Sequence, residues 1–348
     1  MAADRSLWYT RCPLPTASGI ALDAGILQDR MAAAGLSVAS IESAGDPSAR
    51  ASHFTHATPK LFRQGGNIPP IWARSNGAET ALVGIAWTRE YQTILARPEA
   101  SIRSAEELRG KRLALPVRTS GEIDFWQAMC LRGYDSALRT AGLTLDDVEL
   151  VRLPVVERYI EQPARGEQQA WMWAGAARTR RQQAETFAFI RGEVDALYAS
   201  GALGAQLEAL LQAQVVVDLG FHPDRRVQIN NQVPNILTAD AALARERPDV
   251  VARYLRALNE AADWAAGHAD DARRTCAREV GAPEEWIDIS YRRDHVERLT
   301  VSLGDELIGA VAEQKRFLLQ HGFITRDFDI EDWVSRQAYE LSIREDFA

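Results

Sequence analysis

Hydrophobic residues follow two different periods at the start of the chain. Residues 7–10 form a short apolar run that predicts a strand, and residues 16–34 place apolar side chains on one helical face. Gly35 is a typical helix stop, and residues 36–41 then alternate between apolar and polar positions, as a half-buried strand does. The N-terminus is therefore predicted to fold as strand, helix and strand.

Strands and helices continue to alternate as far as residue 219. Further strands are predicted at 81–87, 91–96, 111–115, 148–153, 192–198 (after a turn) and 215–219, and helices at 68–73, 125–131, 136–141, 184–190 and 203–211. Residues 42–50 are expected to be a polar loop, and residues 161–183 are irregular enough to be either a mobile flap or a poorly packed insertion. Beyond residue 233 the pattern becomes helical, at 249–266, 269–279, 295–320 and 331–339.

This order of elements predicts an α/β fold. Alternating strands and helices favour a mixed, mostly parallel sheet flanked by helices, and two such series followed by a helical return predict two lobes with a cleft between them. We expect lobe I to contain residues 1–115 and 233–348, and lobe II to contain residues 116–232.

Composition and charge narrow the class of protein. With 348 residues, 46% hydrophobic and 25% charged, the chain is typical of a soluble globular protein. Its net charge of −8 argues against nucleic acid or an anionic membrane as the main partner. No stretch approaches the roughly 18 apolar residues of a membrane span. An anionic ligand would therefore have to be attracted by local cations.

The cysteines and the N-terminus indicate a reducing compartment. Cys12, Cys130 and Cys276 are scattered, without the spacing of a zinc site or a dithiol redox motif. Residues 1–6 hold no apolar core of a signal peptide, so we expect a cytoplasmic protein, and a monomer. No glycine-rich nucleotide loop and no cluster of metal ligands is visible, so we expect no cofactor and no metal.

Cys12 is the first candidate for chemistry. A lone cysteine is often only a small buried hydrophobe. Cys12, however, lies in a proline-rich turn between a predicted strand and a predicted helix. Amide groups at a helix start can stabilise a thiolate, and ligands of open α/β sheets bind at the carboxyl ends of strands. Cys12 could therefore be either a structural or a catalytic thiol.

Three further features could serve such a thiol. His53 or His56 could be its proton partner, although either could equally be a surface histidine in a loop. Arg63 has the planar fork that suits an oxyanion, but it could simply be solvated. Arg63 and Gly65-Gly66 are expected in the loop before a proline-started helix at 68–73, where the glycines could make a tight turn or let backbone N–H groups approach an anion.

Together these residues resemble a known family. The sequence is similar to the 2'-hydroxybiphenyl-2-sulfinate desulfinases, which carry Tyr-x-x-Cys-Pro-x-Pro, His-Phe-Thr and Arg-x-Gly-Gly-x-Ile-Pro-Pro segments. Here these segments are residues 9–15, 53–55 and 63–70. The resemblance is dense over residues 8–20 and 51–70 and faint in the helical C-terminal part.

The resemblance implies a fold and a set of roles. The fold would be that of the type II periplasmic binding proteins, with two lobes closing on the ligand. Cys12 would be the catalytic thiol, His53 its partner, and Arg63 with the Gly66 amide the sulfinate clamp. The other implied substrate-binding residues are Gly65, Phe54, His56, Thr58 and Trp126. Trp126 would either form an aromatic wall of the substrate pocket or be a core residue. His56 and Thr58 stand where the family has a Tyr and a Gln, so they point to a different sulfinate as the substrate.

The expected activity is hydrolysis of the C–S bond of a small anionic organosulfur compound, an aryl sulfinate, with release of sulfite. Cys12 would attack sulfur as a thiolate or protonate the ring carbon as a thiol. The alternative class is a non-catalytic solute-binding protein of an ABC-type transporter for organosulfur or aromatic anions, since fold does not determine function. A cytoplasmic ligand sensor is a third possibility.

Overall fold

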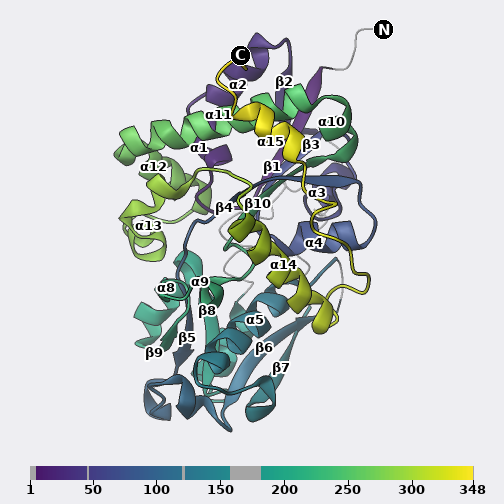
Figure 1. Ribbon diagram of the computed structural model, residues 1–348. Coiled ribbons are helices and arrows are strands. Elements are labelled where there is room, and N and C mark those ends of the chain that lie inside the picture. The colour runs from purple at the N-terminus through teal and green to yellow at the C-terminus, as the bar shows by residue number, and fades with distance from the viewer. Residues whose placement is uncertain (1–4, 45–46, 120–121, 157–181, 348) are drawn as a thin grey trace. The chain divides into compact units, whose positions relative to one another are not determined.

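Two compact units make up the chain. The computed structural model describes residues 5–44, 47–119, 122–156 and 182–347. Unit 1 contains Met1–Thr88, Asn231–Val280 and Arg293–Ala348, and unit 2 contains Arg89–Asn230 and Gly281–Arg292 (Figure 1). This division differs from the predicted one, in which the chain first crossed between lobes after residue 115. Most of the irregular stretch predicted at 161–183 lies outside the described residues.

Unit 1 is built on a five-stranded sheet. Its order is β2 (Ser37–Ser40), β1 (Ser6–Arg11), β3 (Leu61–Gly65), β10 (Asn235–Asp240) and β4 (Thr80–Ala86). β1 pairs in parallel with β2 and β3, whereas β10 runs antiparallel to both β3 and β4. The carboxyl ends of β1, β3 and β4 therefore lie at one edge of this sheet.

The helices of unit 1 come from three stretches of the chain. They are α1 (Ala17–Asp23), α2 (Ile26–Ala33), α3 (Pro47–Thr55), α4 (Ile68–Ser75), α10 (Ala241–Glu246), α11 (Pro248–Gly267), α12 (Ala269–Val280), α14 (Asp305–Gln320) and α15 (Arg336–Ser342), with 3-10 turns η1 (Ile41–Ala44) and η5 (Arg293–Arg298). α11 packs against α1, α2 and α15. The helix predicted at 16–34 is two helices, because Gly25 adopts a left-handed conformation (φ 75°) between α1 and α2.

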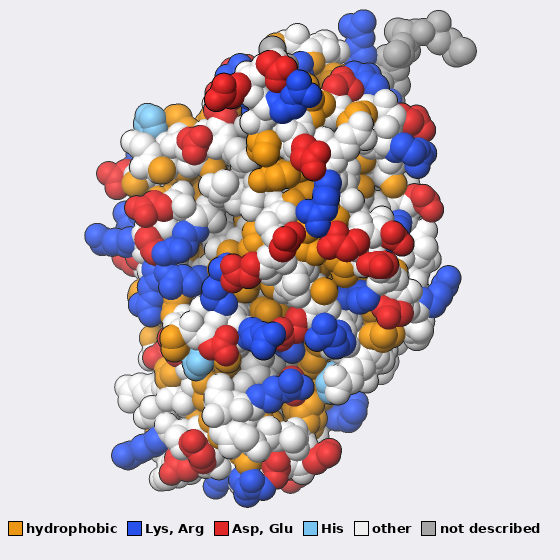
Figure 2. Space-filling model, viewed as in Figure 1, with side chains coloured by type: hydrophobic (Ala, Val, Ile, Leu, Met, Phe, Trp, Pro, Cys, Tyr) orange, Lys and Arg blue, Asp and Glu red, His pale blue; other side chains and the backbone are white. Residues whose placement is uncertain are grey.

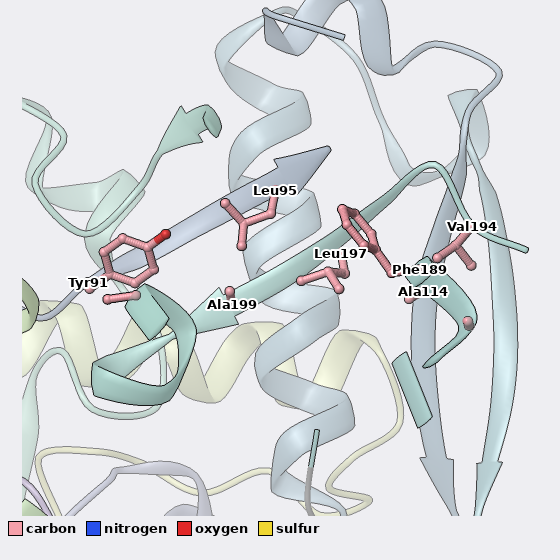
Figure 3. Packing of buried hydrophobic residues seen from close by; sticks show 9 residues of the cluster. Tyr91, Leu95, Ala114, Phe189, Val194, Leu197 and Ala199 are labelled. Atoms are coloured by element: carbon pink, nitrogen blue, oxygen red, sulfur yellow. The ribbon is translucent and has the colours of Figure 1, made fainter. Parts of the chain in front are cut away.

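Unit 2 repeats the mixed-sheet architecture. Its sheet order is β7 (Glu149–Val155), β6 (Arg112–Arg118), β8 (Ala196–Ser200), β5 (Gln92–Ala96) and β9 (Gln214–Asp218). Its helices are α5 (Phe125–Thr140), α7 (Gln183–Ile190), α8 (Gly201–Leu211), α9 (Arg225–Gln228) and α13 (Glu284–Tyr291), with 3-10 turns η2 (Pro98–Ala100), η3 (Ala105–Leu108) and η4 (Leu145–Asp147). Tyr91, Leu95, Phe189 and Leu197 belong to its hydrophobic core (Figure 3).

Long-range pairing explains where the predicted boundaries differ. β5 and β6 both belong to the unit 2 sheet, where β5 pairs with β8 and β9, and β6 with β7 and β8. The chain must therefore leave unit 1 before β5, at Thr88. Two α/β units with mixed, mostly parallel sheets are confirmed, because the described strands of each sheet run in one direction except β10 in unit 1 and β5 in unit 2, which run antiparallel to both neighbours.

One predicted helix break is absent. Residues 125–131 and 136–141 were expected as separate helices, but α5 is continuous across Gly133. A Cβ atom at this glycine would lie 2.3 Å from the Tyr198 ring. The glycine therefore permits close packing of the helix on β8 rather than ending the helix.

Candidate active site

Cys12 lies directly after β1, at the carboxyl edge of the unit 1 sheet. The register places Arg11 beside Gln64 of β3, and the N–H of Cys12 donates to the Gln64 carbonyl at 3.0 Å. Cys12 is only 7% exposed. A Cβ atom on Gly65 would lie 2.3 Å from the Cys12 Sγ, so β3 must end in glycine for the thiol to occupy this position.

His53 contacts the thiol from α3. This helix begins at Pro47, inside the stretch 42–50 that was expected to be a polar loop, and His53 is a buried helix residue rather than a surface histidine in a loop. His53 Nε2 lies 3.6 Å from Cys12 Sγ, and Nδ1 lies 2.8 Å from the Thr10 hydroxyl oxygen. The imidazole is buried and bridges Thr10 of β1 and Cys12 directly after it, which suits a group that passes a proton to or from the thiol.

Arg63 is the fixed cation beside the thiol. It lies within β3 and is completely buried, in contrast to the predicted loop position. Its Nε donates to the His53 carbonyl at 2.9 Å, Nη1 donates to the Gly66 carbonyl at 2.8 Å, and Nη2 donates to Cys12 Sγ at 3.5 Å. Burial lowers the pKa of Arg63, and the nearby Cys12 acts in the opposite direction.

The turn after Gly65 is held by Asn231, just before β10. The Asn231 carbonyl accepts from the N–H of Asn67 at 2.6 Å, and Asn231 Oδ1 accepts from the N–H of Ile68 at 2.9 Å. A Cβ atom on Gly66 would lie 2.5 Å from this Asn231 side chain. Gly65 and Gly66 are thus both required, because neighbouring side-chain atoms leave no space for a Cβ atom at either position. The helix α4 starts where the sequence predicted.

His56 lies near Arg63 but does not contact the thiol. It adopts a left-handed conformation with φ 56°. Nδ1 lies 3.1 Å from the Phe54 carbonyl, and Nε2 lies 3.2 Å from the Thr238 hydroxyl oxygen. Burial, together with the Arg63 charge, lowers the pKa of His56 to about 3. His56 is therefore neutral, with its proton on Nδ1 because a carbonyl can only accept.

The remaining predicted site residues have different surroundings. Phe54 is buried in unit 1, with its ring edge-on to the His53 ring at 5.2 Å between centroids. The Thr58 hydroxyl lies 2.7 Å from the Ser52 hydroxyl and closes the turn after α3. Trp126 belongs to α5 of unit 2, where its Nε1 donates to Glu185 at 2.7 Å. Burial raises the pKa of Glu185 to about 7.

Sequence reasoning missed Thr10, Gln64 and Asn231. Thr10 could have been found, because it stands two residues before Cys12 and shares its face of the strand. Gln64 Oε1 accepts from the N–H of Ser18, and the Thr16 hydroxyl accepts from the N–H of Gly19. These first-turn amides of α1 thus bind side chains of the protein, and the polar groups that contact the thiol are Arg63 and His53.

The wider surroundings add two observations. No helix in the described part of the chain is long and apolar enough to cross a membrane. Within the same ranges, no group of three or more His, Cys, Asp or Glu side chains is arranged to hold a metal ion. On the face in Figure 2, basic and acidic side chains are intermixed, so no extended field of one sign covers this face.

Comparison with known proteins agrees with the motifs. No protein-family profile matches the chain. Two curated proteins named 2'-hydroxybiphenyl-2-sulfinate desulfinase, from Rhodococcus erythropolis and Rhodococcus qingshengii, are 27% identical to it over 360 residues, covering 97% of this chain and 93% of theirs. The predicted resemblance to the desulfinases is confirmed. It extends over nearly the whole length of both chains, including the C-terminal part where the motifs are faint.

Solved structures resemble the chain in fold. A cysteine-to-serine mutant of the desulfurization enzyme DSZB, in complex with biphenyl-2-sulfinic acid, superposes with a TM-score of 0.75 at 24% identity, covering 97% of this chain and 98% of the other. The periplasmic aliphatic sulphonate binding protein SsuA from Escherichia coli gives a TM-score of 0.64 at 18% identity, covering 95% and 92%. The desulfinase-like chain therefore has the periplasmic-binding-protein-like fold that the sequence predicted.

Proposed function

We propose that this protein is a desulfinase that hydrolyses the C–S bond of an aryl sulfinate. The reaction is R–SO₂⁻ + H₂O → R–H + HSO₃⁻, and it needs no cofactor. The observation that carries the proposal is the convergence of Cys12, His53 and Arg63 at one edge of the unit 1 sheet. The likeness to proteins named as desulfinases supports the same assignment.

Arg63 and the N–H of Gly66 form the proposed sulfinate clamp. A guanidinium has more N–H groups than the three bonds that Arg63 makes within the described residues, so donors are left for the oxygens of a ligand. Donors of this kind contribute about 3–4 kcal/mol each to catalysis in comparable oxyanion sites. Complete burial removes competition from water and strengthens the attraction for an anion.

Cys12 is the proposed catalytic thiol, and His53 is its proton partner through Nε2. Thr10, at 2.8 Å from Nδ1, orients the imidazole. Gly65 leaves the space that the thiol occupies, and the Phe54 ring packs edge-on to the His53 ring. His56 is a neutral group that replaces the family's tyrosine, and Thr58 supports α3 through Ser52.

We further propose that the enzyme acts in the cytoplasm as a monomer. The three cysteines are free and buried, which suits a reducing compartment. Cell fractionation and gel filtration test these two points. Recovery outside the cytoplasm, or a dimer at working concentration, would contradict them.

A test of the activity is sulfite release from a panel of aryl and alkyl sulfinates that includes biphenyl compounds. Wild type is expected to release sulfite, Cys12→Ser to lose turnover, and the matched thiol controls Cys130→Ser and Cys276→Ser to retain it. Arg63→Ala is expected to lose sulfinate affinity much more than Cys12→Ser does. A Cys12→Ser protein as active as wild type would refute the role of the thiol.

A solute-binding protein is the second candidate, and one observation favours it. Sulfonate-binding proteins share the fold over nearly the full chain, with a TM-score of 0.64 for SsuA from Escherichia coli. Calorimetry on the same panel separates the two functions. Tight sulfinate binding by wild type without any sulfite release would establish the receptor and reject the enzyme.

A further inference from the structure

Arg63 is a buried cation that has no carboxylate partner among the residues that the structure describes. Its three hydrogen-bond acceptors in the described residues are the carbonyls of His53 and Gly66 and the sulfur of Cys12. A carbonyl oxygen carries no net charge. Among these partners, only the Cys12 sulfur can therefore supply a full negative charge.

A buried guanidinium needs a counter-ion, because removing a charge from water is costly unless an opposite charge compensates it. Arg63 is completely buried and Cys12 nearly so. A Cys12 thiolate would balance the Arg63 charge in the resting protein. His53 is then best neutral, because a second buried cation beside Arg63 would leave the site with an excess positive charge.

A sulfinate brings its own negative charge to the same guanidinium. If the Cys12 thiolate persisted, two anions would share one buried cation at close range. Two negative charges this close repel each other, so the thiol and the sulfinate are not both ionised and one of the two takes up a proton. A sulfinic acid is a stronger acid than a thiol, so the proton goes to Cys12.

We propose that Arg63 exchanges its counter-ion on ligand binding: the sulfinate replaces the Cys12 thiolate, which becomes a thiol, so the site binds a monovalent oxyanion together with one proton. The step is Cys12–S⁻ + R–SO₂⁻ + H⁺ → Cys12–SH·R–SO₂⁻. The proton comes from solvent, and His53 Nε2, 3.6 Å from the sulfur, is the group that passes it on. The identity of the ligand rests on the proposed function, and a thiol in the complex favours proton donation over attack on sulfur.

Two charged or ionisable neighbours of the site, His56 and Arg11, do not account for such a proton. His56, next to Arg63, is already neutral and makes hydrogen bonds to Phe54 and Thr238. Arg11, the neighbour of Cys12 on β1, instead donates to both carboxylate oxygens of Glu279 on α12, each at 2.5 Å. Proton uptake that is lost in Cys12→Ser is therefore not due to His56 or Arg11, and the expected acceptor is the Cys12 sulfur.

The experiment is isothermal titration calorimetry with benzenesulfonate, an unreactive and permanently charged aryl oxyanion, and with benzenesulfinate where it is not turned over. Titrations in two buffers of different ionisation enthalpy give the number of protons taken up. For wild type we expect about one proton per ligand above neutral pH, and an affinity that falls about tenfold per pH unit. Cys12→Ser should show neither effect.

Cys12→Ser provides a sharper contrast at alkaline pH. Since it lacks the competing thiolate, it should bind benzenesulfonate more tightly than wild type there, whereas a thiol that merely contacted the ligand would predict weaker binding. The other thiols do not interfere, because burial raises the pKa of Cys276 to about 12 and that of Cys130 well above its usual value.

Several results would overturn the exchange. These are wild-type binding without proton uptake, a pH dependence that persists in Cys12→Ser, or no binding of either probe at any pH. The proposed function fails separately. Proton-coupled binding without sulfite release from any sulfinate would reject the desulfinase and leave the exchange intact, while sulfite release without proton uptake would reject only the exchange.

Discussion

Gly65→Ala tests whether the position of the thiol limits catalysis. The added Cβ would lie 2.3 Å from Cys12 Sγ and 2.7 Å from Cys12 Cβ. An ordinary contact needs at least 3.4 Å, so the sulfur has to retreat by about 1.1 Å. The backbone adds to the conflict, because Gly65 has a φ of 156°, which other residues rarely adopt.

The size of the effect follows from this displacement. A misplacement of about 1 Å between reacting groups can cost roughly a hundredfold in rate. Movement of the sulfur also disturbs its contacts with His53 Nε2 and Arg63 Nη2. We therefore expect kcat for sulfite release to fall about a hundredfold, and overpacking to lower the free energy of unfolding by about 1–3 kcal/mol.

Gly84→Ala is the matched control in the same unit. Its Cβ would lie 2.1 Å from Val301 Cγ1, so overpacking should cost a similar free energy of unfolding while the thiol stays in place. The assays are sulfite release, alkylation of Cys12 by iodoacetamide, and denaturation by urea. A Gly65→Ala protein with wild-type kcat and wild-type alkylation rate would refute the reasoning, as would equal losses of kcat in both variants.

Three further predictions concern neighbouring features. Thr10→Val should lower kcat/KM about fivefold and Thr10→Ser should restore it, because the hydroxyl that orients His53 is lost and regained; equal kinetics would exclude the role. The pKa of His56 is lowered to about 3, so its contribution to stability is complete above the unfolded pKa of about 6.5 and is lost as pH falls towards 3. The slope is at most about 1.4 kcal/mol per pH unit, and His56→Asn, which tolerates a positive φ, should flatten it in urea titrations at several pH values. Gly309→Ala, at an exposed position in α14 with nothing within 4 Å, should raise the free energy of unfolding by about 0.5–1 kcal/mol, and a loss of stability would contradict this.

Local patterning was sufficient for most elements around the site. The strand before Cys12, the helix that starts with Ile68, Pro69 and Pro70, and the two helices α11 and α12 were predictable. Each depends on interactions between residues a few positions apart, such as hydrophobic periodicity, a proline at a helix start, or a glycine stop. The motifs around Cys12, His53 and Arg63 also carried the resemblance to the desulfinases.

Long-range pairing decided the remainder. No local signal could reveal that β10 pairs antiparallel with β3 and β4, or that β5 joins the second sheet, because strand pairing depends on residues far away along the chain. The strand position of Arg63 in β3 was missed for the same reason.

The chemistry of the site likewise depends partly on the sequence alone and partly on the tertiary structure. The residue types in the sequence determined that a thiol, an imidazole and a guanidinium were present, since these groups are covalent properties of the chain. Only the tertiary structure decided that Arg63 is buried against Cys12 and that no carboxylate of the described part of the chain pairs with it, because burial and proximity arise when residues 12, 53 and 63 meet. The charge of a buried group depends on those neighbours, which its identity alone does not specify.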